Sequence, residues 1–199
     1  MILRIGLLLA ALMILATCSG GDSDGPGGQV CTRGVIGERI ASIPGKLPGC
    51  AVRNPVKVYS VQGIKLSRPA IMDCSTAKAL NKWTRQSVKP SFAKEGARVS
   101  TMVVYDDYNC RTRNNRPGAK LSFHAKGRAV DIGEFILADG RRVTVLKDWR
   151  STEWGATLQK LHKAACGPFR TVLGPNHDRL HANHFHLDTA SGYGGLYCR

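Results

Sequence analysis

The sequence predicts one α+β domain in which a small antiparallel β-sheet is flanked by helices and braced by three disulfides. Short runs of β-branched residues separated by turn residues predict the strands, and two longer stretches with helical periodicity predict the helices. Six cysteines that follow an apolar N-terminal segment predict the disulfides.

The expected strands are spread along the whole domain. The first precedes a turn at Gly63, and the pair Asp139-Gly140 is typical of a hairpin turn between two strands. A polar stretch rich in turn residues, 109–120, separates the second strand from the third. We expect strands at 56–61, 99–105, 128–137, 142–146, 171–173 and 184–188.

Two segments have helical periodicity. The first, 77–88, is expected to be capped by Asp73 or Ser75 and to be interrupted by Pro90. The second, 152–166, is expected to end at the Gly-Pro pair that follows it.

The N-terminal segment has the features of a secretion signal. Arg4 precedes an unbroken apolar run that is too short to span a bilayer comfortably. The Leu-Ala-Thr-Cys sequence that ends at Cys18 resembles the bacterial lipobox, in which the cysteine becomes the lipidated first residue. We expect residues 1–18 to be this signal; the alternative is an ordinary signal peptide cut nearby. Either way, we expect a protein of the periplasm or cell envelope, anchored to the membrane only through lipidated Cys18.

Composition divides the rest of the chain in two. Residues 19–30 are glycine-rich and almost free of apolar side chains, so we expect them to be a flexible linker. Residues 31–199 have the composition of a globular domain and are numerous enough for one core. We expect this domain to be a monomer.

Six cysteines remain after Cys18. An even number in an exported chain indicates three disulfides, and the sequence alone leaves their pairing open. A zinc–cysteine site is the alternative, but no two of these cysteines have CxxC spacing. They are Cys31, Cys50, Cys74, Cys110, Cys166 and Cys198.

The chain is strongly basic. It has 29 Lys and Arg residues against 14 Asp and Glu residues, a formal net charge of +15 at pH 7. Such a surface favours polyanions, and outside the cytoplasm the expected partner is peptidoglycan or another anionic polymer of the envelope. Nucleic acid is not expected, because the compartment is wrong and no aromatic-rich recognition motif is present.

Two histidine-rich segments carry the candidate chemistry. The first contains His124 and Asp131, and the second contains His181, His184 and His186. Alternate side chains on a strand share a face, and a hairpin-like approach would bring the first two residues beside His186. Two imidazoles and one carboxylate form a recurring catalytic zinc set that leaves a fourth position for water. The spacing therefore predicts one zinc ion, held by His124, Asp131 and His186.

Other interpretations of these residues are weaker. In one alternative the histidines are ordinary hydrogen-bonded groups. Three histidines within six residues, next to Phe185 and Leu187, do not resemble a solvated face. A cupin-like metal site needs a glutamate shortly after the HxH pair, and none is present. The chain has no GxSxG motif, and no free cysteine is expected.

Six short motifs together carry a family resemblance. They lie at 74–83, 108–111, 122–131, 137–140, 171–175 and 181–186. Over roughly residues 31–199 the chain resembles the bacterial extensin-like C-terminal domain family, which is similar to the LAS group of lysostaphin-type, D-Ala-D-Ala and murein endopeptidases. The resemblance implies a LAS/hedgehog-like zinc peptidase core that hydrolyses an amide bond in peptidoglycan stem peptides.

The resemblance also implies a role for each site residue. His124, Asp131 and His186 would hold the zinc, and His184 would stay unligated as proton shuttle or oxyanion stabiliser. Arg111 matches an arginine that steadies developing negative charge, a role that suits a fixed cation. The alternative for Arg111 is an ordinary surface arginine beside a disulfide.

Two positions depart from the family pattern. Phe123 replaces the glutamate that usually precedes His124, and Asn183 stands where the family generally has Asp or Glu. Asparagine cannot accept a proton at neutral pH, so His184 or His181 would be the general base. The alternative function is a metal-containing envelope-binding lipoprotein with weak or no activity.

Overall fold

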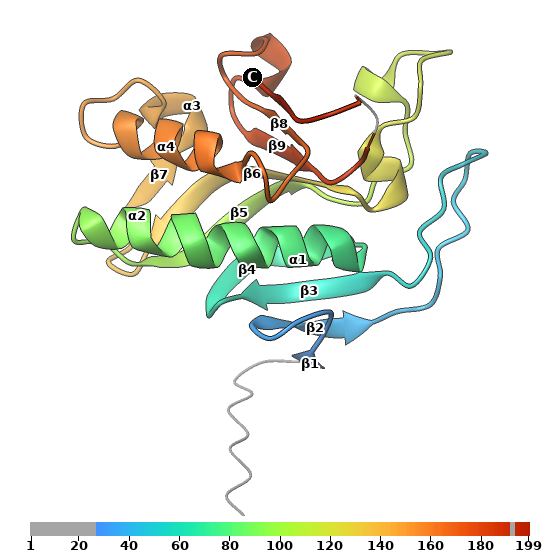
Figure 1. Ribbon diagram of the computed structural model, residues 1–199, viewed down its shortest axis with the longest axis horizontal. Coiled ribbons are helices and arrows are strands. Elements are labelled where there is room, and N and C mark those ends of the chain that lie inside the picture. Colours follow the sequence, from blue (N-terminus) through green and yellow to red (C-terminus); the bar gives the residue numbers. More distant parts are fainter. Residues whose placement is uncertain (1–26, 192–193) are drawn as a thin grey trace, which may run out of the picture.

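The computed structural model describes residues 27–191 and 194–199, and its strands form one continuous sheet (Figure 1). The strand order is β1-β2-β3-β4-β5-β6-β9-β8-β10, and β7 pairs with β6 beside this path. The strands are Gly28–Gln29 (β1), Val35–Arg39 (β2), Val56–Val61 (β3), Ile64–Met72 (β4), Val99–Asp106 (β5), Ala129–Leu137 (β6), Arg142–Thr144 (β7), Thr171–Leu173 (β8), Phe185–Asp188 (β9) and Tyr197–Cys198 (β10).

The α+β class is confirmed, but the expectation of a small, antiparallel sheet is wrong. Ten strands are present in the described residues, and β4 with β5 and β8 with β10 are parallel. The first parallel pair follows from the long helical connection between β4 and β5, which returns the chain to the starting edge as in a crossover unit. Strands β4 and β10 were not predicted, so neither parallel pair was expected.

Strand β4 contains a proline, a residue that normally argues against a central strand. The pairing of β3 with β4 is irregular between Val58 and Ser60, whose partners are Ala70 and Lys65. Pro69 lies inside this irregular stretch, where its missing N–H interrupts no regular ladder.

The first predicted helix is longer than expected. Helix α1 (Cys74–Trp83) continues through a π-helical segment, η1 (Thr84–Val88), into α2 (Lys89–Lys94). The Lys89 N–H bonds to the carbonyl of Thr84, five residues back. Pro90 therefore does not interrupt the helix; it lies in the first turn of α2, where a missing N–H is tolerated.

Boundaries also differ from the prediction around β7 and α4. The strand expected at 142–146 ends at Thr144, because Thr144 and Asp148 cap a short helix, α3 (Val145–Asp148). The Thr144 hydroxyl accepts from the Lys147 N–H at 3.1 Å, and the Thr144 N–H donates to the Asp148 carboxylate at 2.7 Å. Helix α4 (Gly155–Ala165) begins three residues later than predicted.

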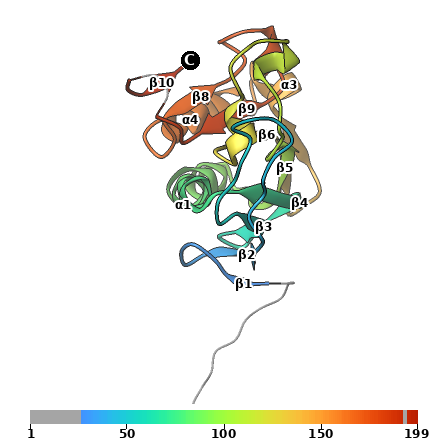
Figure 2. The same cartoon turned by 90° about the vertical axis from the view of Figure 1, so that its right-hand side faces the viewer.

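The helices cover one face of the sheet, and the hydrophobic core lies between the helices and the sheet. Trp83 of α1 packs near the rings of Phe135 and Phe169, with centroids 6.3 and 6.5 Å away, and its indole N–H donates to the Leu161 carbonyl at 2.9 Å. Figure 2 shows α1 almost end-on, to one side of strands β3 to β6.

The face of β6 that is turned away from the core carries a polar group of the predicted site. On β6, Val130 and Ile132 belong to the core, so Asp131 between them points away from it. Asp131 pairs directly with His186 of β9 across the antiparallel ladder. The sheet register thus places two of the predicted ligands side by side.

Three disulfides are present, as predicted. They join Cys31 to Cys74, Cys50 to Cys110 and Cys166 to Cys198. The second disulfide attaches the connection between β2 and β3 to the segment that carries Arg111.

The predicted signal at 1–18, with Cys18, lies outside the described residues. Of the predicted 19–30 linker, Gly28–Gln29 form β1 against β2, and Val30 is 7% exposed and part of the core, so the ordered domain includes these residues. Over the described ranges, no helix is both long and apolar enough to cross a membrane.

Candidate metal centre

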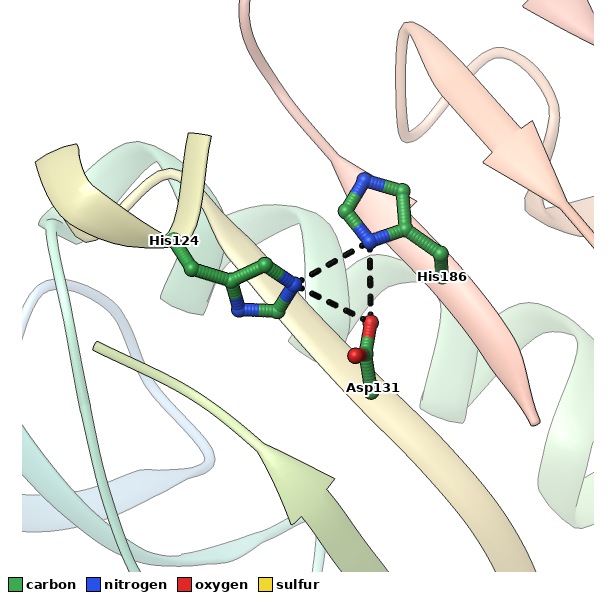
Figure 3. A group of neighbouring side chains, drawn as sticks. All are labelled: His124, Asp131 and His186. Atoms are coloured by element: carbon green, nitrogen blue, oxygen red, sulfur yellow. Dashed lines mark hydrogen bonds and ion pairs between the residues drawn. The ribbon is translucent and has the colours of Figure 1, made fainter. Parts of the chain in front are cut away.

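His124, Asp131 and His186 converge on one point (Figure 3). His124 lies on a 3-10 turn, η3 (Phe123–Lys126), directly before β6. Its Nε2 is 3.2 Å from Asp131 Oδ1 and 3.1 Å from His186 Nδ1, and the last two atoms are 2.9 Å apart. These three atoms, two from paired strands and one from the turn before β6, form a compact triangle. We call His124 Nε2, Asp131 Oδ1 and His186 Nδ1 the donor triangle.

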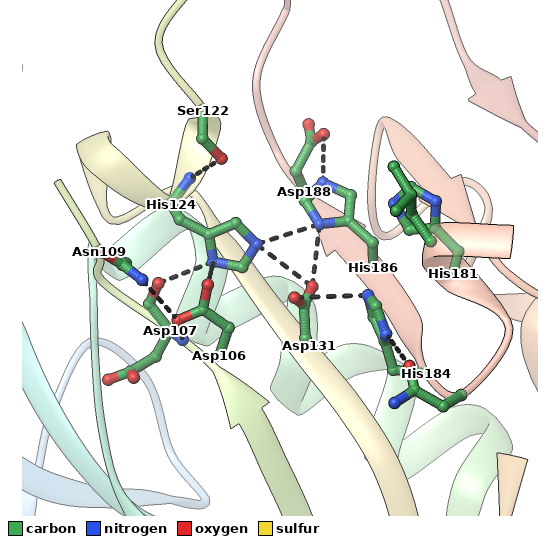
Figure 4. Close-up of polar contacts among 12 residues, drawn as sticks. Asp106, Asp107, Asn109, Ser122, His124, Asp131, His181, His184, His186 and Asp188 are labelled. Carbon is green, nitrogen blue, oxygen red and sulfur yellow. Dashed lines mark hydrogen bonds and ion pairs between the residues drawn. The ribbon is translucent and has the colours of Figure 1, made fainter. Parts of the chain in front are cut away.

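The outward-facing nitrogen of each imidazole is held by a second group (Figure 4). His124 Nδ1 lies 2.7 Å from the backbone carbonyl of Asp107, and His186 Nε2 lies 3.2 Å from Asp188 Oδ2. Since both partners are acceptors, each ring donates outward, and the nitrogen that faces Asp131 is the one that can bind a metal ion once it carries no proton. This outer support is the usual arrangement around metal-bound histidine.

The donor set fits a zinc ion. Zinc–nitrogen distances of about 2.0–2.1 Å place the donors of a tetrahedral site roughly 3.3 Å apart. The three measured separations, 2.9 to 3.2 Å, lie within a few tenths of that value. The buried Asp131 carboxylate also needs a positive charge beside it, which either a proton on His186 or a metal ion supplies.

The charges at the centre favour a cation. Burial by itself would raise the pKa of Asp131, but the adjacent His124, together with His186, holds this pKa well below its usual range. Burial opposes protonation of His186, yet the hydrogen bonds and charges of Asp131 and Asp188 raise its pKa to about 9. The two carboxylates therefore attract a positive charge to this point, and a metal ion would compete with the proton.

His184 lies next to the triangle without being part of it. Its Nε2 is 3.5 Å from Asp131 Oδ2, and its Nδ1 is 2.8 Å from Asn183 Oδ1. Asn183, which departs from the family pattern, thus accepts a hydrogen bond from His184 and leaves Nε2 facing the centre. Burial lowers the pKa of His184, although the charge of Asp131 partly opposes this effect. A neutral ring with a lone pair on Nε2 can accept a proton.

His181 lies one layer further out. Its ring centroid is 5.3 Å from that of His184 and 5.9 Å from that of His186. Its Nδ1 is 2.7 Å from the Asp178 carboxylate. Burial lowers the pKa of His181, while the hydrogen bond to Asp178 works in the other direction. Of the two proposed bases, His184 is therefore the nearer to the donor triangle.

Arg111 lines the same cleft and forms an ion pair there. Its Nη2 is 2.7 Å from Asp106 Oδ2, and the side chain is about one-fifth exposed (21%). The neighbouring disulfide at Cys110 holds its backbone in place. Arg111 is thus a positioned cation in the wall of the site, with part of its charge balanced by Asp106.

These residues line an open cleft of about 660 Å³. Tyr105, Phe123, His177 and Leu180 also line the cleft. The Tyr105 ring lies over Gly133, where a Cβ would come within 2.2 Å of it, so a larger residue at 133 would displace this ring from the cleft. The cleft is large enough for a short peptide segment to reach the donor triangle.

No role was predicted for the groups that orient the histidines. Asp188 follows His186 at the spacing that places both on one strand face, and Asp178 precedes His181 by three residues; both spacings are visible in the sequence. Asp107 acts through its backbone carbonyl, which leaves no side-chain signal. Its carboxylate accepts the Ile71 N–H at 2.6 Å, which fixes the position of that carbonyl.

Residues 30–199 match the family described as the extensin-like protein C-terminus. The chain belongs to this family. No curated protein and no solved structure matches the chain. The matched residues include β2 to β10 and all three residues of the donor triangle. The family description names no activity, so the function is inferred from the chemistry of the cleft.

Proposed function

We propose that the extensin-like domain is an exported zinc-dependent peptidase or amidase that hydrolyses an amide bond in peptidoglycan stem peptides. The observation that carries the proposal is the convergence of His124, Asp131 and His186 in an open cleft. Two imidazoles and one carboxylate are typical of catalytic zinc sites, whereas structural sites usually have four protein ligands. A bound zinc ion supplies a water with a pKa near about 7 and polarises the scissile carbonyl.

The chain's own residues supply the remaining chemistry. His184 is neutral and has its Nε2 beside the centre, so it accepts the proton that the attacking water loses and returns it to the leaving amine. Arg111 places positive charge in the cleft wall, where it stabilises negative charge that develops on the carbonyl oxygen. His181 is the alternative proton acceptor.

We further propose that the domain shares the LAS/hedgehog-like peptidase core. The support is the placement of the two motifs. The histidine of HxxxxxxD lies on a turn, its aspartate lies on a central strand, and the last histidine of HxH lies on the antiparallel neighbour of that strand.

The proposed setting is the periplasm or cell envelope, with a lipid on Cys18 as anchor and the domain acting as a monomer. Three disulfides fit an oxidising compartment. A formal net charge of +15 fits an anionic polymer such as peptidoglycan as the partner.

A second candidate function is favoured by Asn183, which replaces the acidic residue expected in the family. The amide orients His184 but cannot take up a proton itself. In this alternative the domain holds the metal and binds the envelope with weak or no hydrolysis.

Digestion of purified peptidoglycan separates the two functions. The zinc-loaded protein and its chelator-treated form are incubated with the polymer, and the fragments are mapped by mass spectrometry. We expect metal-dependent cleavage of a peptide amide. Sedimentation of the protein with chemically intact peptidoglycan would instead support the binding protein.

Variants test the roles within the centre. We expect His186→Ala and Asp131→Ala to lower zinc affinity by more than about 100-fold, beyond the usual effect of losing an outer-shell partner. His184→Ala should keep its zinc and lose roughly 10²–10⁴-fold in turnover. Leu146→Ala, which changes an exposed side chain outside the cleft, is the matched control. Loss of zinc from His184→Ala would contradict the assignment of ligands.

A further inference from the structure

A second group of metal-ligating side chains lies on the connection between β8 and β9. His177, Asp178 and His181 each offer one donor atom, and these atoms lie within 4.8 Å of one another. His177 Nε2 is 3.4 Å from Asp178 Oδ2, and His181 Nδ1 is 2.7 Å from Asp178 Oδ1. None of the three belongs to the donor triangle, although all three line the same cleft.

Local structure holds these side chains in place. Asp178 caps a 3-10 turn, η4 (Arg179–His181), because its Oδ1 accepts the N–H groups of Leu180 at 2.8 Å and His181 at 3.1 Å. The His177 N–H donates to the Gly174 carbonyl at 2.9 Å. The donor atoms are therefore brought together before any cation arrives, which lowers the entropic cost of binding.

The chemistry of the group selects a class of cation. Two imidazoles with one carboxylate suit Zn²⁺, Cu²⁺ or Ni²⁺, whereas Mg²⁺ and Ca²⁺ prefer oxygen ligands alone. The side chains are 27%, 40% and 15% exposed for His177, Asp178 and His181, so water reaches them. By contrast, the Asp131 side chain in the donor triangle is only 7% exposed.

We propose that His177, Asp178 and His181 form a second site for a divalent transition-metal ion such as Zn²⁺. The site binds more weakly than the donor triangle, because its ligands are more exposed and Asp178 shares its charge with the backbone of η4. The proposal stands on the three side chains themselves and does not depend on hydrolytic activity.

Zinc titration of the metal-free full chain, followed by isothermal calorimetry, tests the proposal. We expect two classes of site, one tight and one weaker, each near one ion per chain. His177→Ala should weaken the second class by about tenfold or more and leave the first unchanged. His186→Ala should remove the tight class and leave the weaker one.

Two variants serve as checks on folding. Asp178→Asn keeps an oxygen that can cap η4 but loses the charge, so it should also weaken the second class by about tenfold or more. Leu180→Ala changes an exposed side chain between the ligands and should leave both classes intact. Circular dichroism confirms that each variant is folded.

The outcomes distinguish the two sites. A single class of zinc in the unaltered chain, or a second class that persists in both His177→Ala and Asp178→Asn, overturns the proposal. If His186→Ala leaves both classes in place while His177→Ala removes one, the second site stands and the proposed catalytic centre fails.

Discussion

Histidine has two different environments in this domain. The cleft histidines have polar partners, whereas His162 on α4 lies among apolar groups, with ring centroids 5.6 Å from Trp149 and 5.3 Å from Phe185. Its Nε2 has no hydrogen-bond partner within the described part of the chain. Burial lowers the pKa of His162, an effect partly offset by a hydrogen bond with the backbone of Arg199.

This environment makes the stability of the domain depend on pH. Because the folded pKa of His162 lies below its ordinary value near about 6.5, the unfolded chain binds the proton more readily, and stability falls as the pH drops below that value. We expect His162→Leu to reduce the loss of unfolding free energy between pH 7.5 and 5. At pH 7.5 the change should cost less than about 1.5 kcal/mol. Urea denaturation at both pH values measures this; equal losses in the two proteins would contradict it.

At the same scale, the site was predictable in part. The sequence places His124, Asp131 and His186 in two motifs, and the fold brings these side chains within hydrogen-bond distance, with the β6–β9 register setting Asp131 opposite His186. The orienting contact from Asp107 was not predictable, since a backbone carbonyl is common to every residue.

At the scale of the element, the start of α1 links the helix layer to the turn that carries His124. Asp73 Oδ1 accepts the Thr76 N–H at 2.8 Å, and the Asp73 N–H donates to the Gly127 carbonyl at 2.8 Å. Gly127 ends the η3 turn that carries His124, and its φ of 63° suits glycine. One residue thus caps a helix and fixes the neighbouring turn.

Removal of this cap should destabilise the domain. We expect Asp73→Ala to lower the free energy of unfolding by about 1 kcal/mol, the usual value for loss of an N-cap. Asp73→Asn keeps a cap acceptor and should cost less than half as much. Urea denaturation compares the variants. Equal losses would indicate that the charge of Asp73, which lies 3.5 Å from Arg128, matters more than the cap.

Elements were predictable where local pattern and tertiary context agree. The runs that became β3, β5, β6 and β8 are rich in β-branched residues and were predicted close to their observed bounds. The expected interruption at Pro90 was wrong because a π-helical segment precedes that residue, and β4, in which an irregular pairing accommodates Pro69, was not predicted. Both accommodations depend on tertiary packing, which a local pattern does not encode.

At the scale of the whole molecule, the disulfides attach peripheral segments to the sheet. The Cys50–Cys110 bond joins residues 60 apart, and the segment beside Cys110 forms part of the cleft wall. Cys50 is fully buried, so the bond is part of the packed structure.

Removal of this disulfide should lower the free energy of unfolding more than removal of a helix cap. We expect the double variant Cys50→Ala, Cys110→Ala to lose roughly 2–4 kcal/mol of unfolding free energy, because the unfolded chain gains the freedom of a long loop. Denaturation under non-reducing conditions provides the measurement, with Leu146→Ala as the surface control. A loss below about 1 kcal/mol would mean that other contacts already restrain the segment in the unfolded state.

The donor triangle also joins parts of the chain that lie far apart in the sequence. His124 and His186 are 62 residues apart and lie side by side in the sheet that β6 and β9 help to form. A cation that binds both imidazoles would therefore bind the folded domain more tightly than the extended polypeptide. Uptake of a coloured ion such as Co²⁺ would then report how much of the protein has its central strands paired.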